Sequence, residues 1–229
     1  ALLLLLVLLT GCGAKTEEAP WQTAYRETGK YLQEQDALSV GSVGGEWAVI
    51  GLSRAGLLSD ETAQSYEQTV EDYVKQAGSV RLHHAKSTEN SRAILGLTAA
   101  GYNAANMAGV DLTAGLTDMA YLRAQGTNGP IWALIALDCH GYDIPQCADG
   151  EEQTTCEGLV AEILSYQCSD GGWALMGDES DVDMTAMALT SLAPYQEETD
   201  IKAAVDAPLT YLSDAQQADG GFMSWGAAN

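Results

Sequence analysis

Asp138, Cys139 and His140 are consecutive in the sequence, and Cys147 and Cys156 follow within the same part of the chain. Carboxylate, thiolate and imidazole groups are the usual zinc ligands in proteins. Neighbouring side chains of a helix point roughly 100° apart, however, so consecutive residues rarely bind one metal ion. We therefore predict no metal site in this segment.

The composition argues against several other chemistries. The chain has 32 acidic and 10 basic residues, and its formal net charge is −22. Such a surface repels phosphate backbones, so we expect no nucleic-acid partner. The sequence contains no phosphate-binding loop or nucleotide fingerprint, and no Ser/His/Asp arrangement stands out, so no cofactor is predicted.

The start of the chain indicates export. Residues 1–9 form an apolar run that is too short to span a bilayer and is typical of the core of a signal peptide, although no positive n-region precedes it. Leu9-Thr10-Gly11-Cys12 resembles the bacterial lipobox. This resemblance implies that diacylglycerol is attached to the Cys12 thiol; a chance cysteine after an ordinary signal is the alternative. We expect an extracytoplasmic protein anchored to the membrane, with a signal peptide over 1–12, a tether over 13–19 and a folded domain over 20–229.

Four cysteines follow Cys12, at Cys139, Cys147, Cys156 and Cys168. Disulfides can form in an exported protein. A bond between Cys147 and Cys156 would close the loop before a predicted helix, and free thiols are the alternative. The sequence leaves both possibilities open.

From residue 20 onward, apolar residues recur at helical spacing, with almost no strand-like alternation. Gly56, Gly78, Gly101 and Gly141 are typical of helix ends. The predicted helices cover 21–36, 45–56, 60–77, 88–101, 112–124, 130–141, 151–167, 183–195 and 199–217.

Two kinds of helix alternate along the chain. One kind is small and apolar on nearly every side and must be buried; the other, such as 60–77 or 199–217, is amphipathic and acidic and would cover it. The apolar helices recur every 40–55 residues or so, which fits one helical hairpin per repeat. They share the pattern Ala-x-x-x-Leu, at Ala48/Leu52, Ala93/Leu97, Ala133/Leu137 and Ala188/Leu192.

A second repeat lies in the turns. The segments Gln167–Trp173 and Gln216–Phe222 both read Gln-x-x-Asp-Gly-Gly-aromatic, and Gln125–Ile131 is a weaker copy. We interpret the Gln and Asp side chains as groups that hold the turn, and the aromatic ring as a plug between the two layers of helices.

These turns resemble the QW motif of squalene and terpenoid cyclases. The alternation of helices resembles the α/α toroid of those cyclases, of protein prenyltransferase β subunits, of transcobalamin-like corrinoid carriers and of complement thioester domains. The resemblance implies an all-α fold, an α/α toroid with inner and outer rings of helices that is incomplete at its C-terminal end. A closer resemblance, to secreted Firmicutes proteins with prenyltransferase/squalene-oxidase repeats, is carried by segments that begin at Gly44, Ser87, Asn128 and Asp183.

The resemblance also draws attention to Asp181-Val182-Asp183-Met184. Class II terpenoid cyclases carry Asp-x-Asp-Asp-Thr-Ala, whose middle Asp protonates an alkene, and Asp183 falls on that position. Met184 replaces the next carboxylate, although so strong an acid needs crowded carboxyl groups. We therefore interpret Asp183 as a helix N-cap, with a catalytic acid as the alternative.

In a toroid of this type the inner helices run parallel, so their N-terminal ends meet at one mouth. Aromatic, Met and a few polar side chains around a concave site suit an amphipathic ligand. The alternative is that the Trp rings fill the interior and bind nothing. The residues expected at this mouth are Glu46, Trp47, Glu89, Asn90, Arg92, Trp132, Asp183, Met184 and Trp225.

Together these features predict an exported, lipid-anchored surface protein whose toroid binds a small hydrophobic or amphipathic ligand, or a protein partner, rather than catalysing a reaction. A corrinoid is one such ligand. A terpenoid cyclase or prenyl-transfer enzyme is one alternative, and a structural repeat module for protein–protein contact is the other.

Overall fold

The computed structural model describes residues 19–34, 38–41, 45–224 and 226–228. Within these ranges the chain is mostly helical, with almost no strand, which confirms the predicted all-α class. No helix in the described ranges is both long enough and apolar enough to cross a bilayer. The elements are α1 (Pro20–Gln33), α2 (Glu46–Arg54), α3 (Asp60–Ala77), α4 (Thr88–Ala99), η1 (Ala104–Asn106), η2 (Leu112–Leu116), α5 (Met119–Arg123), α6 (Asn128–Asp138), α7 (Cys156–Ser165), α8 (Val182–Leu192), η3 (Ala193–Tyr195), α9 (Thr199–Ala215), β1 (Met223–Ser224) and β2 (Ala227–Ala228).

The four glycines expected at helix ends occupy the predicted positions. Gly56, Gly78, Gly101 and Gly141 have positive φ angles of 66°, 61°, 89° and 63°. Each follows α2, α3, α4 or α6 by one to three residues. Positive φ is strained for residues with a Cβ, so these glycines end the helices at little cost.

The prediction of one continuous helix over 112–124 is wrong, because this segment breaks into η2 and α5. At the break, the Met119 N–H donates to the carbonyl of Glu152, and the Thr154 N–H donates to the carbonyl of Thr117, both over 2.8 Å. Because this pairing holds residues 152–154 outside a helix, α7 begins at Cys156 rather than near residue 151. Both departures therefore have one cause, a contact between segments far apart in sequence.

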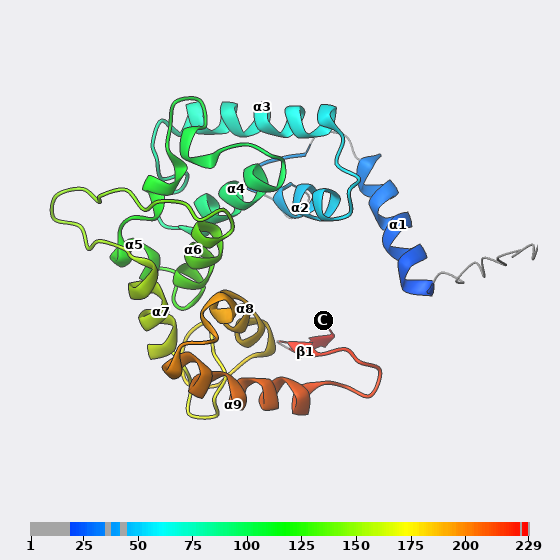
Figure 1. Ribbon diagram of the computed structural model, residues 1–229, viewed down its shortest axis with the longest axis vertical. Coiled ribbons are helices and arrows are strands. Elements are labelled where there is room, and N and C mark those ends of the chain that lie inside the picture. The colour runs from blue at the N-terminus through cyan, green and yellow to red at the C-terminus, as the bar shows by residue number, and fades with distance from the viewer. Residues whose placement is uncertain (1–18, 35–37, 42–44, 225, 229) are drawn as a thin grey trace, which may run out of the picture.

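The helices form two layers that follow an open arc (Figure 1). Inner helices α2, α4, α6 and α8 contact one another in that order along the arc. On the outer side α7 packs against α6 and α9 against α8, and α3 lies along the outer edge. The two predicted kinds of helix therefore correspond to the two layers, while closure into a ring is not seen in the described part of the chain.

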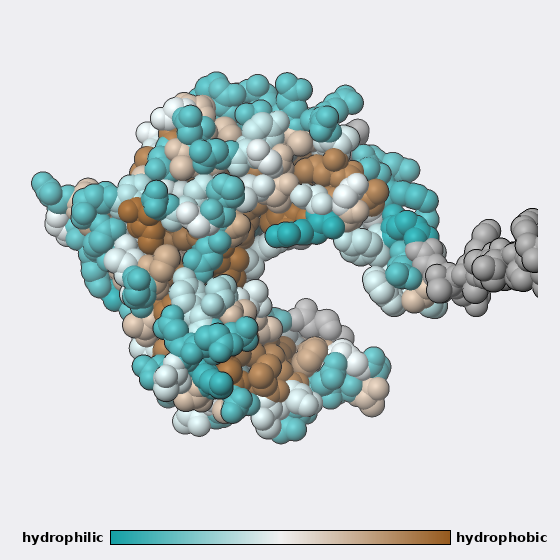
Figure 2. Space-filling view, in the orientation of Figure 1, coloured by the Kyte–Doolittle hydropathy of each residue, from teal (hydrophilic) through white to brown (hydrophobic). Residues whose placement is uncertain are grey.

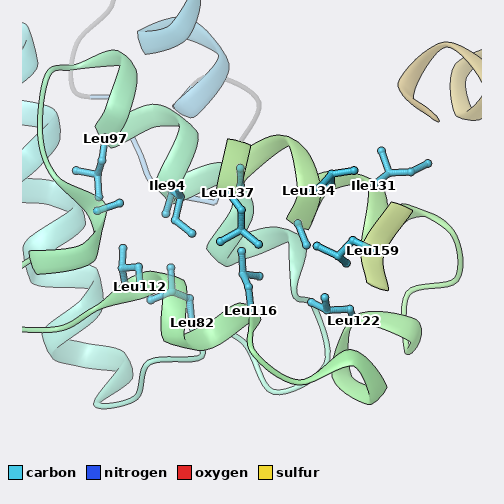
Figure 3. Packing of buried hydrophobic residues seen from close by; sticks show 14 of the residues in the cluster. Leu82, Ile94, Leu97, Leu112, Leu116, Leu122, Ile131, Leu134, Leu137 and Leu159 are labelled. Atoms are coloured by element: carbon cyan, nitrogen blue, oxygen red, sulfur yellow. The ribbon is translucent and has the colours of Figure 1, made fainter. Parts of the chain in front are cut away.

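The core lies between these layers. All eight residues of the Ala-x-x-x-Leu pattern are buried. Small alanines let neighbouring backbones approach closely, and each fully buried leucine contributes about 1.5–3 kcal/mol relative to an exposed one. Figure 3 shows how the larger side chains meet, among them Leu82, Ile94, Leu97, Leu112, Leu116, Leu122, Ile131, Leu134, Leu137 and Leu159.

The turn over Gln167–Trp173 has the predicted arrangement. The Gln167 amide donates from Nε2 to the carbonyl of Gly171, over 2.7 Å, and to that of Ala204 in α9, over 2.8 Å. Trp173 is fully buried, and its indole N–H donates to the carbonyl of Ile163 in α7 over 2.7 Å. This turn therefore ties α7, α8 and α9 together.

Two glycines inside inner helices allow a matched test of the packing. An added Cβ at Gly96 would lie 2.3 Å from the hydroxyl oxygen of Tyr66, a fully buried residue of α3. Nothing lies within 4 Å of a Cβ at exposed Gly51. We expect Gly96→Ala to lower the free energy of unfolding by about 1–3 kcal/mol, because the core is overpacked. Gly51→Ala should raise it by about 0.5–1 kcal/mol. Urea unfolding of both variants measures the difference; equal effects would contradict the packing.

Candidate ligand-binding site at the N-terminal ends of the inner helices

The N-terminal ends of three inner helices border one open cavity of about 370 Å³. The C-terminal ends of the same helices, at Arg54, Ala99 and Cys139, border another. Helices α2, α4 and α6 therefore run in the same direction, as predicted. We call the first cavity the mouth; its described lining residues are Trp47, Lys86, Thr88, Glu89, Arg92, Gln125, Asn128 and Trp132.

Two indole rings form one wall of the mouth. The ring centroids of Trp47, in the first turn of α2, and Trp132, in the second turn of α6, lie 5.2 Å apart with a tilt of 59°. This distance falls in the favourable range for aromatic pairs. Trp47 remains 36% exposed, so the pair presents an aromatic surface to solvent rather than filling the core.

Charged side chains lie beside the indole pair. Arg92 Nη2 and Glu89 Oε1, both in the first two turns of α4, form an ion pair of 2.7 Å. The buried Nε of Arg92 has no hydrogen-bond partner among the described residues. Lys86 adds a second cation, exposed, just before α4. The lining thus has two cations and one carboxylate, in a chain whose net charge is −22.

Glu46 lies behind this surface and does not line the mouth. Its side chain is fully buried, and its Oε1 accepts a hydrogen bond of 2.7 Å from the Gly41 N–H. The other oxygen, Oε2, has no partner in the described ranges. Burial raises the pKa of Tyr66, the negative charge of Glu46 raises it further, and Arg92 opposes the rise. Glu46 and Arg92 therefore both act on Tyr66 of α3, which lies behind the mouth.

Asn90 is used by the fold itself. It is fully buried, and its Oδ1 accepts from the Leu82 N–H over 2.8 Å. Its Nδ2 donates to the carbonyls of Val80, over 2.6 Å, and Leu112, over 3.0 Å. With three backbone partners, Asn90 joins α4 to the preceding loop and to η2, and it is not part of the mouth.

Asp183 lies apart from the indole pair. The interpretation of Asp183 as the N-cap of α8 is wrong, because Asp181 has that role: its backbone is extended, and its Oδ1 accepts from the Met184 N–H over 2.8 Å. Met184 is buried in the core. Asp183 Oδ2 instead accepts from the Ser224 hydroxyl over 2.6 Å. The carboxylate borders a separate, mostly apolar cavity of about 310 Å³, with Val182, Ala186, Leu212 and Phe222.

Of the residues predicted at the mouth, Trp47, Glu89, Arg92 and Trp132 line this cavity. Its other described lining residues, which the sequence did not suggest, are Lys86, Thr88, Gln125 and Asn128. Gln125 could have been found, because it begins the weaker copy of the turn motif. Its Oε1 accepts from the Ser87 hydroxyl and from the Thr88 N–H, over 3.1 and 3.0 Å, and so caps α4. Two predicted functional residues, Cys12 and Trp225, lie outside the described residues.

The segment considered for metal binding is arranged differently. Asp138 Oδ1 accepts from the Tyr195 hydroxyl over 3.0 Å, the Cys156 Sγ lies 3.9 Å away, and burial raises the pKa of Asp138. Among the described residues no group of three His, Cys, Asp or Glu side chains is placed to hold a metal ion. Cys147 and Cys156, considered above as a disulfide, are both free thiols in this structure.

Comparisons with known proteins add nothing to this geometry. No protein-family model, no curated protein and no solved structure matches the chain.

The indole pair should have a spectroscopic signature. Two rings this close couple their electronic transitions and give a paired band in the far-ultraviolet circular dichroism spectrum. We expect Trp47→Phe and Trp132→Phe each to remove the whole band, and the control Trp21→Phe, on α1, to leave it intact. A band that survives either of the first two changes would show that the rings are not paired in solution.

Proposed function

We propose that this chain is a lipid-anchored α/α-toroid module that binds an amphipathic ligand with an acidic group at the mouth. One observation carries the proposal: a solvent-facing indole pair, Trp47 and Trp132, borders the same cavity as the cations Lys86 and Arg92. Aromatic walls with a few convergent polar groups are typical of small-molecule sites.

The arrangement of helices supports the toroid. Inner helices α2, α4 and α6 run parallel, and outer helices α7 and α9 pack on α6 and α8, as expected for the helical hairpins of the families that the turns resemble. Continued at the same curvature, such an arc would return on itself. The inner side of the arc is hollowed, as Figure 2 shows.

The charges of the mouth support an anionic ligand. The described lining has two cations and one carboxylate, with the Glu46 carboxylate buried behind it, whereas the chain as a whole repels anions. The apolar part of the ligand would lie on the indole rings.

Oleate and oleyl alcohol form a matched pair of probes, because they share one chain and differ in the acidic group. We expect oleate to change the tryptophan fluorescence on titration and Trp132→Ala to weaken its binding by about 10- to 100-fold, as expected for the loss of 1.5–3 kcal/mol of apolar contact. Arg92→Met should weaken oleate binding while leaving oleyl alcohol unaffected. A corrinoid is titrated in parallel, with its absorbance as the readout.

Equal binding of oleate and oleyl alcohol would contradict the role of the cations. A complete lack of response to oleate, oleyl alcohol and corrinoid would contradict ligand binding at the mouth and favour a structural module for protein–protein contact. Trp21→Phe, which alters an indole outside the mouth, is the control for general fluorescence changes.

The cavity at Asp183 favours one competing function. A carboxyl group that borders an apolar cavity is the arrangement in which an acid could protonate a hydrocarbon, as in the cyclases that the motif resembles. Asp181 is engaged as the helix cap, however, so Asp183 supplies the single carboxyl among the described residues that line this cavity. In the cyclase motif crowded carboxyl groups strengthen the acid, and here Met184 stands in the place of the next carboxylate.

We therefore expect no product when the protein is incubated with squalene or with prenyl diphosphates and the mixture is analysed by chromatography. Formation of a product that Asp183→Asn abolishes, while Asp181→Asn lowers only the stability, would replace binding by catalysis as the function.

A further inference from the structure

An aromatic stripe on α1 faces solvent. Trp21 and Tyr25 are 68% and 50% exposed, and their spacing of four residues places them on one face of the helix. Leu32, seven residues after Tyr25, continues the same face and packs against the core. At the C-terminal end of α1 this face packs against the rest of the protein. At the N-terminal end of α1 no described residue covers it.

The docked end is firmly held. Gly29 is buried against Leu57, where an added Cβ would lie 2.3 Å from Leu57 Cδ1. The Gln33 amide donates from Nε2 to the carbonyl of Leu57 over 2.5 Å. From this contact α1 extends along the edge of the arc, with its N-terminal end away from α2 (Figure 1). The orientation of the stripe is therefore fixed relative to the domain.

The charge of α1 is opposite in sign to that of the whole chain. The helix contains two basic residues, Arg26 and Lys30, and one acidic residue, Glu27, which pairs with Lys30 over 2.9 Å. The whole chain has a net charge of −22. Basic residues are attracted to anionic lipids, and Trp and Tyr, which combine an apolar ring with a polar tip, are enriched where a bilayer meets water.

The distance from the proposed anchor is short. Seven residues, 13–19, separate Cys12 from Pro20. Fully extended, they span at most roughly 25 Å, which is less than the roughly 30 Å of a bilayer's hydrocarbon core. A lipid on Cys12, which is part of the proposed function, would thus hold α1 close to the membrane. At the resulting high effective concentration, even a weak contact between α1 and the bilayer would form.

From these observations we infer that the Trp21–Tyr25 face of α1 binds the headgroup region of an anionic phospholipid bilayer and orients the domain on the membrane. The anchor determines that the protein stays at the membrane, and the stripe determines how the domain faces it.

The test separates the stripe from the anchor. The full chain with Cys12→Ala, which cannot be lipidated at that position, is sedimented with vesicles of phosphatidylcholine and phosphatidylglycerol in a three-to-one mixture. We expect Trp21→Ser with Tyr25→Ser to lower the affinity for these vesicles by about tenfold or more, and salt or pure phosphatidylcholine to weaken it as well. Tyr31→Ser, at an exposed aromatic residue on another face of α1, is the matched control and should change the affinity less than about twofold.

A second readout does not depend on affinity. Lipids brominated near the headgroup should quench part of the fluorescence of the parent chain, and Trp21→Phe should remove that part. Circular dichroism confirms that the variants remain folded, since both changed side chains are exposed.

The inference is overturned if the parent chain fails to bind these vesicles, if Tyr31→Ser reduces binding as much as the double variant does, or if the stripe instead joins two copies of the chain that Trp21→Ser and Tyr25→Ser separate. Incorporation of labelled fatty acid into the unaltered chain, abolished by Cys12→Ala, tests the anchor by itself. If the chain binds vesicles but is not lipidated, the inference about the stripe holds and the anchor is rejected. If the chain is lipidated but does not bind vesicles, the anchor holds and the inference about the stripe is rejected.

Discussion

The inner helices must be buried on nearly every side, and the remaining structure depends on this requirement. Helix α6 is apolar around most of its circumference, and it contacts α4 on one side, α8 on another and α7 on the outside. Contacts this close need small side chains at the crossing points, which the buried alanines Ala93, Ala133 and Ala188 supply. Each inner helix thereby needs a neighbour on both sides and a cover on the outside, and this need produces a curved, two-layered row.

The same constraint creates the mouth. Because the chain returns before the next inner helix begins, α2, α4 and α6 start at the same end of the layer. Their first turns are less confined than their middles, so larger and polar side chains fit there. Trp47 and Trp132 meet across this end, and Arg92 lies beside them. The site is thus a consequence of the parallel direction of the inner helices.

The charge distribution follows a similar division. Acidic residues occupy the outer helices, as in α3 with Asp60, Glu61 and Glu71, where water solvates them. The few cations lie at particular places: Arg123 pairs with Glu152 and Glu162, Lys86 and Arg92 line the mouth, and α1 has a small positive excess. Arg123 is neutralised by its two glutamates, so in this strongly acidic chain the mouth and α1 are the places where anions, whether ligands or lipid headgroups, are less repelled.

The sequence by itself determined the helices, their alternation and most of their ends, because helical periodicity and glycines such as Gly78 and Gly101 act within a few residues. It also placed Trp47, Glu89, Arg92 and Trp132 at one mouth, since a repeat puts equivalent positions at equivalent places. Only the tertiary structure decided what distant partners control. The pairing of Met119 with Glu152 splits a predicted helix. Asn90 is hydrogen-bonded to three backbone groups and is not part of the mouth. Asp181 caps α8, and Asp183 borders another cavity. These outcomes depend on contacts between residues far apart in the chain, and local sequence patterns contain no information about such contacts.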